Sequence, residues 1–288
     1  MMKKLSFIKK SNGNHWVGDG FPVRGIFSYA DIAQEMSPFL LMDYAGPAYF
    51  PPTTNKLGVG QHPHRGFETV TIVYDGGVSH RDSSGAGGTI EPGDVQWMTA
   101  ASGIIHEEYH SPAFAQSGGA FEMVQLWVNL PAKDKMTSPY YQGITNAEIP
   151  EASLPDDAGI ARIIAGSYEH TTGPASTFTP MNVWDLRLKA NHHVSFQLPE
   201  GHTTALFILK GKVKIEDKHL VHEAELAVME REGDVFSFSV EEETTALLLN
   251  GAPLNEPVVG HGPFVMNTRE EISQAIFDYN NGQFGKIS

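Results

Sequence analysis

Two pairs of residues of metal-binding type recur at the same spacing in the first half of the sequence. His62 and His64 stand in the segment HPH, and His106 and Glu108 stand in HEE. Residues i and i+2 of a β-strand project from the same face, so each pair can direct two ligand atoms to one side of a sheet. Two such strands that face each other across a barrel would present three imidazoles and one carboxylate to a common point.

This set of donors suits a transition metal. Imidazole nitrogens favour Fe(II), Mn(II), Ni(II), Cu(II) or Zn(II) and disfavour magnesium and calcium. The chain has no cysteine, which rules out thiolate ligands and disulfides. Four protein ligands leave an octahedral ion two open positions, enough for water and a substrate. An isolated HxH pair is often a surface feature, so the spacing alone leaves both a metal site and a non-functional pair open.

Short apolar runs between turn-forming residues predict an all-β fold. Segments such as FETVTIVYDGG and TALFILKGKVKI are rich in β-branched and aromatic residues, and the chain has 29 Gly and 18 Pro. Such a pattern is typical of a sandwich or barrel. One helix is expected near the end of the chain, where Thr268 and Glu271 can form a capping box. The apolar stripe that follows at helical spacing consists of Ile272, Ala275, Ile276 and Tyr279.

The two halves of the sequence echo each other. EPGDVQWM at 91–98 is similar to REGDVFSF at 231–238, and YDGGV at 74–78 has a looser echo in LKGKV at 209–213. Both matches occur in the same order and at nearly equal offsets. They predict a duplicated β unit.

We therefore expect two domains, at residues 1–140 and 141–288. The segment between residues 131 and 167 is rich in proline and in small and polar residues, which is typical of a linker. The second half contains neither an HxH nor a His-x-Glu pair. Its barrel is expected to hold no metal and to serve structure or partner contacts.

The overall composition excludes some classes of protein. A net charge of −14 argues against direct binding of nucleic acid, which requires clustered Lys and Arg. The opening MMKKLSFIKK has too short an apolar run for a signal peptide, and no segment is as long as a membrane span. We expect a cytoplasmic protein without membrane contact, and the absence of cysteine fits a reducing compartment.

The longest motif gives a family resemblance. The run HPHRGFETVTIVYDGGVSHRDSSGAGGTIEPGDVQWMTAASGIIHEE resembles the signature of pirins, which belong to the cupin superfamily, and GHGPFVMNTREEISQAI resembles their C-terminal segment. The resemblance implies two tandem cupin β-barrels (double-stranded β-helix or jelly-roll) with a short C-terminal helix. It also implies a metal, usually iron, in the N-terminal barrel. The ligands carried over from the pirin pattern are His62, His64, His106 and Glu108.

Neighbouring carboxylates have other expected roles. Glu68 stands where the general cupin pattern often has its carboxylate ligand, but the pirin pattern takes Glu108 instead. Glu68 is then a candidate to orient a ligand imidazole through its free N–H. Glu107 should face the other side of the strand. His80 and His110 could line the entrance of the site, but the default expectation for both is an ordinary surface position.

The resemblance implies an oxidoreductase of the quercetin 2,3-dioxygenase type. A flavonol or another aromatic substrate would react with O2 in a water-poor cavity and release carbon monoxide, with Glu108 as the catalytic base that takes the substrate's hydroxyl proton. An apolar wall could come from side chains that for the most part are expected to fill the barrel, namely Trp97, Met98, Phe121, Met123 and Trp127. The alternative is a non-enzymatic regulator, a metal-dependent redox sensor that binds transcription-related or metabolic proteins through its acidic surface.

Overall fold

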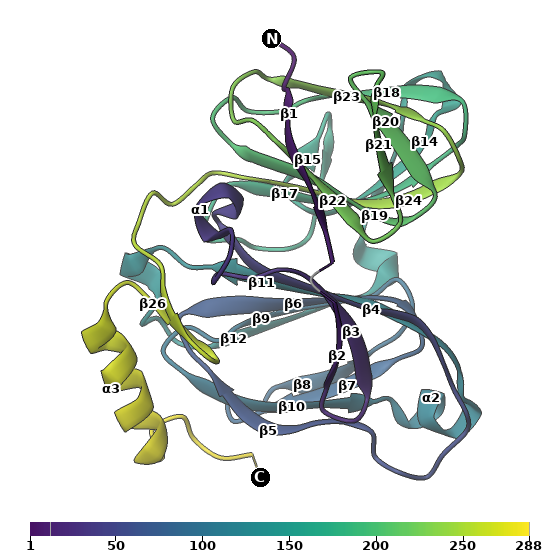
Figure 1. Cartoon of the computed structure of the whole chain (residues 1–288). Coiled ribbons are helices and arrows are strands. Elements are labelled where there is room, and N and C mark those ends of the chain that lie inside the picture. Colours follow the sequence, from purple (N-terminus) through teal and green to yellow (C-terminus); the bar gives the residue numbers. More distant parts are fainter. Residues whose placement is uncertain (12, 288) are drawn as a thin grey trace. The chain divides into compact units, whose positions relative to one another are not determined.

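The structure, a computed structural model, describes residues 1–11 and 13–287 and divides into two compact units (Figure 1). Unit 1 comprises Met1–Ser11, Gln34–Pro38 and Ala147–Leu254. Unit 2 comprises Asn12–Ala33, Phe39–Asn146 and Asn255–Ser288. Unit 1 is built mainly from the second half of the chain but includes the N-terminal stretch. Unit 2 is built mainly from the first half but includes the C-terminal stretch. The division into residues 1–140 and 141–288 stays a prediction.

Unit 2 is built from two antiparallel sheets that lie face to face (Figure 1). The larger sheet has the spatial order β12 (Tyr140–Ile144), β9 (Val95–Thr99), β6 (Phe67–Asp75), β11 (Gly119–Asn129), β4 (Phe39–Phe50), β3 (Phe21–Phe27) and β2 (Asn14–Val17). The smaller sheet has the order β5 (Gly58–His64), β10 (Ile104–His110), β7 (Val78–Asp82) and β8 (Gly87–Ile90). The predicted ligands lie on β5 and β10, in the smaller sheet.

Unit 1 has the same plan. Its larger sheet has the order β1 (Leu5–Lys10), β22 (Glu225–Met229), β19 (Thr203–Lys210), β24 (Thr244–Gly251), β17 (Met181–Leu188), β14 (Gly159–Ala165) and β13 (Glu151–Ser153). The smaller sheet has the order β18 (His192–Gln197), β23 (Val235–Val240), β20 (Lys212–Ile215) and β21 (His219–His222). The predicted all-β fold, two double-sheet barrels in tandem, is confirmed.

Short elements complete the chain. The two-stranded pairs are β15 (Ser167–Tyr168) with β16 (Thr171–Thr172), and β25 (Val259–His261) with β26 (Phe264–Met266). The helices are α1 (Ala33–Met36), α2 (Pro112–Ser117), η1 (Ala132–Asp134), η2 (Asn146–Glu148), η3 (Pro155–Asp157) and α3 (Arg269–Asn280). Among the described residues, no helix is long and apolar enough to span a membrane.

The matching strand orders show which sequence echo marks the duplication. β9 and β22 hold corresponding places, as do β10 and β23. The echo between 74–78 and 209–213 falls on the corresponding turns that lead into β7 and β20. The echo between 91–98 and 231–238 instead connects β9 with β23, so that match does not join equivalent positions.

Strand pairing also identifies the unit 1 positions that correspond to the predicted ligands. In unit 2, His110 pairs with Val78, and His106 pairs with His62. In unit 1, the corresponding pairs are Val240 with Val213, and Phe236 with Phe196. Counting along these strands gives four buried apolar counterparts, Phe196, Leu198, Phe236 and Phe238. Apolar side chains thus fill unit 1 where unit 2 carries residues of metal-binding type. That unit 1 holds no metal stays a prediction, which these side chains support.

Helix α3 begins as the sequence predicts. The Thr268 hydroxyl accepts a hydrogen bond from the Glu271 backbone N–H at 3.2 Å, and the Glu271 carboxylate accepts one from the Thr268 N–H at 2.8 Å. Ile272 and Ala275 are buried among the side chains of the same C-terminal segment. The capping box and the apolar stripe together explain why a helix forms in an otherwise β-rich chain.

The C-terminal segment attaches to unit 2 directly after the HPH motif. The Arg65 N–H donates to the Pro263 carbonyl at 3.2 Å, and the Val265 N–H donates to the Arg65 carbonyl at 3.0 Å. The Arg65 guanidinium, almost fully buried, contacts the Asp278 carboxylate on α3 at 2.8 Å. The backbone position of His64 is therefore tied to residues that lie about two hundred positions later in the chain.

A buried lysine side chain reinforces this attachment. Lys135, which follows η1, is 1% exposed. Its Nζ donates to the Gly66 carbonyl at 2.6 Å, to Asn129 Oδ1 at 2.6 Å and to the Val265 carbonyl at 2.9 Å. One side chain thus satisfies acceptors on β11, on β26 and in the turn after β5.

The first prediction concerns this lysine. Lys135→Met keeps the length of the side chain but leaves three buried acceptors unpaired, each worth about 1–3 kcal/mol. We expect the free energy of unfolding, measured by urea denaturation, to fall by roughly 3 kcal/mol or more. Lys133→Met is the matched control, because Lys133 is an exposed residue of the same turn. Equal stability of the two variants would contradict the assignment.

Candidate metal centre

The predicted ligands lie on neighbouring strands. β5 and β10 are hydrogen-bonded partners, with His62 opposite His106 and His64 opposite Ile104. The expectation that the two strands face each other across a barrel was wrong: the ligands converge side by side on one sheet. The register shifts between His106 and Glu108, because two residues of β5, Gly60 and Gln61, lie opposite the single residue Glu107. Such a bulge bends the strand locally and re-aims its side chains.

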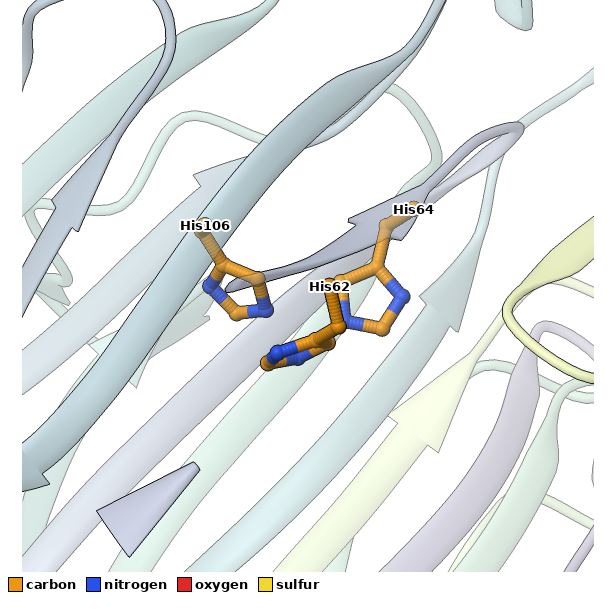
Figure 2. Close-up of side chains that lie close together, drawn as sticks. All are labelled: His62, His64 and His106. Carbon is orange, nitrogen blue, oxygen red and sulfur yellow. The ribbon is translucent and has the colours of Figure 1, made fainter. Parts of the chain in front are cut away.

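Three imidazole rings converge in unit 2 (Figure 2). The ring centroids of His62 and His106 are 4.2 Å apart, those of His64 and His106 are 4.7 Å apart, and those of His62 and His64 are 4.9 Å apart. One nitrogen from each ring lies within 4.8 Å of the others. This spacing brings the three rings close enough to share one ion.

Hydrogen bonds occupy one side of two of these rings. Nδ1 of His62 contacts the Gly60 carbonyl at 2.8 Å, which leaves Nε2 for another partner. Nδ1 of His106 contacts Nδ1 of His80 at 3.3 Å. Within the described part of the chain, Nε2 of His106 and Nδ1 of His64 are buried without a hydrogen-bond partner. Buried polar atoms that lack a partner are costly, so these nitrogens favour a ligand.

The two buried rings are neutral. Burial, reinforced by neighbouring His62, lowers the pKa of His64 well below its usual value. Burial also lowers the pKa of His106 well below the usual value, with His64 and His62 adding to the effect. A neutral imidazole keeps one nitrogen lone pair, which is the form that binds a metal.

The carboxylate of the set points into the same interior. Glu108 is 7% exposed, and its Oε1 has no hydrogen-bond partner among the described residues. Its ligand oxygen lies within 4.8 Å of ligand nitrogens of His80 and His106. Glu107 faces the other way, where Lys56 at 3.2 Å and Arg81 neutralise it, as expected from the alternation of the strand. A cation is the partner that Glu108 lacks, so the donor set fits a transition metal.

A cavity of about 360 Å³ adjoins these residues. Its apolar lining consists of Val17, Phe21, Val23, Val59, Met123, Trp127 and Pro263. Its polar lining consists of His62, His64, Glu108, Asp43 and Gln125. Of the five side chains considered for an apolar wall, Met123 and Trp127 contribute, whereas Trp97, Met98 and Phe121 are fully buried core residues. Most of that set fills the barrel, as expected.

Sequence reasoning missed the two further polar side chains of the cavity. Asp43 on β4 and Gln125 on β11 are paired across the strands, and Gln125 also accepts from the Thr71 hydroxyl at 2.8 Å. Burial raises the pKa of Asp43 to about 6, although nearby His15 opposes the shift. Asp43 is the one charged residue of β4, and Gln125 lies between apolar residues of β11, which also carries Glu122 and Asn129. A polar residue that interrupts an apolar run is the signal that could have identified them.

Three other expectations need correction. His80 and His110 are not surface residues: they are 4% and 5% exposed. His110 contacts the Gly20 carbonyl at 2.8 Å through Nε2 and packs among phenylalanine rings, while His80 stacks on Tyr141. Glu68 accepts a hydrogen bond from the Thr99 hydroxyl at 2.7 Å and not from a ligand imidazole. The imidazole that contacts His106 is His80.

The fold and the site together define a double-barrel protein of the cupin class with a candidate metal centre in one barrel. The family model for pirin matches residues 20–128, and the model for the pirin C-terminal cupin domain matches residues 183–285. The chain belongs to the pirin family, which confirms the resemblance found in its motifs.

Individual relatives agree with this family. The chain is 56% identical over 283 residues to a protein of Pseudomonas aeruginosa that is named "Putative quercetin 2,3-dioxygenase", with 98% and 99% of the two chains covered. It is 54% identical to a quercetin 2,3-dioxygenase from Acinetobacter baumannii, with a TM-score of 0.97 and both chains fully covered. A pirin from Escherichia coli in complex with nickel(II), 20% identical with a TM-score of 0.65, shares the fold over 86% of this chain and 99% of its own. The close relatives support a dioxygenase-like oxidoreductase of the pirin type.

The second prediction concerns metal retention. His106→Ala removes one of the proposed ligands, so we expect loss of stoichiometric metal after dialysis, measured by elemental analysis. Metal should also stop raising the melting temperature, because a ligand stabilises a protein only when it binds the folded state more tightly than the unfolded chain. His261→Ala, at an exposed histidine of the same unit, should behave as the unchanged protein. Full metal retention by His106→Ala would refute the assignment.

The third prediction concerns pH. Asp43 titrates near 3.8 when unfolded and near 6 when folded, so between these values the folded protein holds a proton that the unfolded chain has released. The free energy of unfolding therefore falls as the pH rises from about 4 to about 6, by up to about 3 kcal/mol. Asp43→Asn removes this component. Urea denaturation across this range should show a shallower decline for the variant, and parallel profiles would contradict the buried position of the carboxyl.

Proposed function

We propose that the protein is a metal-dependent dioxygenase that cleaves a flavonol such as quercetin and releases carbon monoxide. Fe(II) is the proposed metal, and Mn(II), Ni(II), Cu(II) or Zn(II) would suit the same donors. His62, His64, His106 and Glu108 would hold it. The observation that carries the proposal is the convergence of three imidazoles beside an apolar cavity, with a carboxylate oxygen of Glu108 within 4.8 Å of a ligand nitrogen of His106. Among the described residues, Nδ1 of His64, Nε2 of His106 and Oε1 of Glu108 are buried without a hydrogen-bond partner.

The cavity suits an aromatic substrate. Its volume of about 360 Å³ lies within the range of small-molecule sites, and most of its lining is apolar. Met123 and Trp127 offer broad contact surfaces, and the apolar lining excludes water from the reacting groups. Asp43 and Gln125 supply polar contacts on the larger sheet, and the ligand residues lie on the smaller one. A flat substrate with hydroxyl groups at both ends fits this division.

A bound transition metal would supply Lewis acidity and a position for oxygen chemistry. The side chains perform the remaining tasks. Glu108, whose Oε1 has no hydrogen bond from the described residues, would take the proton of the flavonol 3-hydroxyl as general base when its own bond to the metal is labile. The neutral His64 and His106 would hold the metal through their lone pairs and would not compete for that proton. The overall reaction balances without a reductant: both atoms of O2 enter the product, two ring C–C bonds break, and one carbon leaves as carbon monoxide with its own oxygen.

The fourth prediction tests turnover. Protein loaded anaerobically with each candidate metal in turn is mixed with quercetin and air, while flavonol loss and carbon monoxide are measured. We expect equal amounts of flavonol consumed and carbon monoxide released with at least one metal, and none for His106→Ala. The control His261→Ala should match the unchanged protein.

The opposite outcome has a defined meaning. Stoichiometric metal without carbon monoxide from quercetin or from other flavonols would contradict the dioxygenase. It would favour the non-enzymatic alternative, a redox sensor whose iron changes charge by one unit between Fe(II) and Fe(III). Absence of metal binding by the unchanged protein would contradict both.

A further inference from the structure

Two buried polar side chains lie behind His106, and the proposed reaction does not use them. His80 and Asp82 occupy consecutive inward positions on β7, the strand that pairs with β10 on the side away from β5. Asp82 lies opposite His106, and His80 lies opposite Glu108. Both side chains are fully buried, so a specific role must offset the cost of removing them from water.

These side chains form a continuous chain of hydrogen bonds to the proposed ligand. Asp82 Oδ2 contacts Nε2 of His80 at 3.2 Å, and Nδ1 of His80 contacts Nδ1 of His106 at 3.3 Å. The Tyr141 ring stacks on the His80 ring with a centroid distance of 5.3 Å and an interplanar angle of 12°. The stacking holds the plane of His80, and the hydrogen bonds hold its rotation within that plane.

The direction of this chain follows from the surroundings of Asp82. Its Oδ1 accepts hydrogen bonds from the Ser84 N–H at 2.8 Å, the Ser84 hydroxyl at 2.6 Å and the Ala86 N–H at 3.3 Å. Burial tends to raise the pKa of Asp82, but the bonds from His80 and Ser84 outweigh burial and lower it. Asp82 is therefore a carboxylate, which can only accept hydrogen bonds.

The hydrogen-bond acceptor at each step determines which nitrogen of the next imidazole carries the proton. Because Asp82 can only accept, His80 must carry a proton on Nε2. With that one proton, His80 offers the lone pair of Nδ1 as the acceptor that faces His106. His106 must donate to that lone pair from Nδ1. A neutral His106 has only one N–H proton, so its Nε2 is left with a lone pair, and Nε2 is the nitrogen without a partner among the described residues.

We propose that Asp82 and His80 are positioning residues that fix His106 in the tautomer whose Nε2 lone pair faces the metal. This inference rests on the proposed function, because it takes His106 as a ligand. Contacts of this kind fix the orientation and raise the basicity of ligand imidazoles. His62 obtains the same constraint from its own strand, through the Gly60 carbonyl.

The other barrel supplies an internal comparison. Counting from the equivalent pairs of Val78 and Val213, the counterpart of His80 is Ile215, which is 1% exposed and belongs to the apolar core. The barrel of unit 2, which carries the residues of metal-binding type, has the buried His80 at this position. The barrel of unit 1 has the apolar Ile215 there. The role of His80 is therefore tied to the ligand set and not to the construction of the barrel.

A competing role for His80 is direct coordination. Nitrogens of His80 and His106 and an oxygen of Glu108 lie within 4.8 Å of one another. However, Asp82 occupies Nε2 of His80, and His106 occupies Nδ1. Coordination by His80 would require one of these bonds to break, and the test below distinguishes the two roles.

Asp82→Asn reverses the chain with a nearly isosteric change. Three N–H or O–H donors surround Oδ1, so the asparagine keeps its carbonyl oxygen there and turns its NH2 group toward Nε2 of His80. His80 must then donate from Nδ1, and the proton of His106 moves to Nε2, where it blocks the metal. We expect affinity for Zn(II) or Ni(II), measured by competition with a chelator, to fall roughly 10- to 100-fold.

The direct readout is the tautomer of His106 in metal-free protein, by nitrogen-15 NMR of the histidine rings. We expect Nδ1 to carry the proton in the unchanged protein and Nε2 to carry it in Asp82→Asn. Ser84→Ala is the matched control, because it removes one donor to Asp82 and keeps the carboxylate. It should preserve both tautomer and affinity. His80→Phe keeps a ring against Tyr141 but removes the acceptor, and it should leave His106 in a mixture of tautomers with weaker metal binding.

The outcomes distinguish a positioning role of Asp82 and His80 from a merely structural role and from direct coordination by His80. An unchanged tautomer and unchanged affinity in Asp82→Asn would overturn the proposal, and so would weaker binding without a change of tautomer, which would indicate a structural effect. Loss of one imidazole from the electron spin echo spectrum of bound Cu(II) in His80→Phe would make His80 a ligand and overturn it too. If the unchanged protein binds no metal, the proposed function fails, and the apo-state tautomers still report whether Asp82 controls His106.

Discussion

Antiparallel pairing of β5 with β10 is the constraint on which the candidate site depends. The register sets His62 opposite His106, and adjacent strands are separated by slightly less than 5 Å, so their rings meet without any rearrangement. A slip of one residue would turn every side chain of β5 to the other face of the sheet. The bulge opposite Glu107 shifts the register of the preceding part of β5 relative to β10, while His62 and His64 keep the register described above. Loop contacts refine a geometry that the sheet has already determined.

A comparison of the two barrels shows that the candidate metal centre makes the interior of unit 2 less favourable for folding. In unit 1 the equivalent positions hold Phe196, Phe236 and Phe238, which pack together as an ordinary core. In unit 2 the same positions hold imidazoles and a carboxylate. Burial lowers the pKa of His64 and His106, and buried ring nitrogens and a carboxylate oxygen have no hydrogen-bond partner among the described residues. Such an interior is less favourable for folding than an apolar one. The difference is consistent with one copy of the duplicated barrel supporting the fold while the other carries the chemistry.

The sequence predicts the features that depend on local spacing. The i, i+2 pairs indicate which side chains share a face, and Thr268 with Glu271 indicates where α3 begins. It does not predict which strands are neighbours, because pairing joins residues about forty positions apart through contacts that no local pattern records. His80 was misjudged because it lies in the polar segment VSHRDSS, where alternate residues face opposite environments. Asp43 and Gln125 reach the cavity through the pairing of β4 with β11, which is equally invisible to local spacing.

The exchange of terminal segments between the units has a consequence for synthesis on the ribosome. Pro263, which lines the cavity, and the partners of Arg65 belong to the stretch from Asn255 onward, so the chain around HPH emerges long before the residues that complete its surroundings. Conversely, β1 emerges first and must wait for β22, more than two hundred residues later. Neither unit can close while the nascent chain is still short. Uptake of the proposed metal at these histidines is therefore expected as a late, post-translational event, and a ribosome stalled near the midpoint would present an open half-barrel to chaperones.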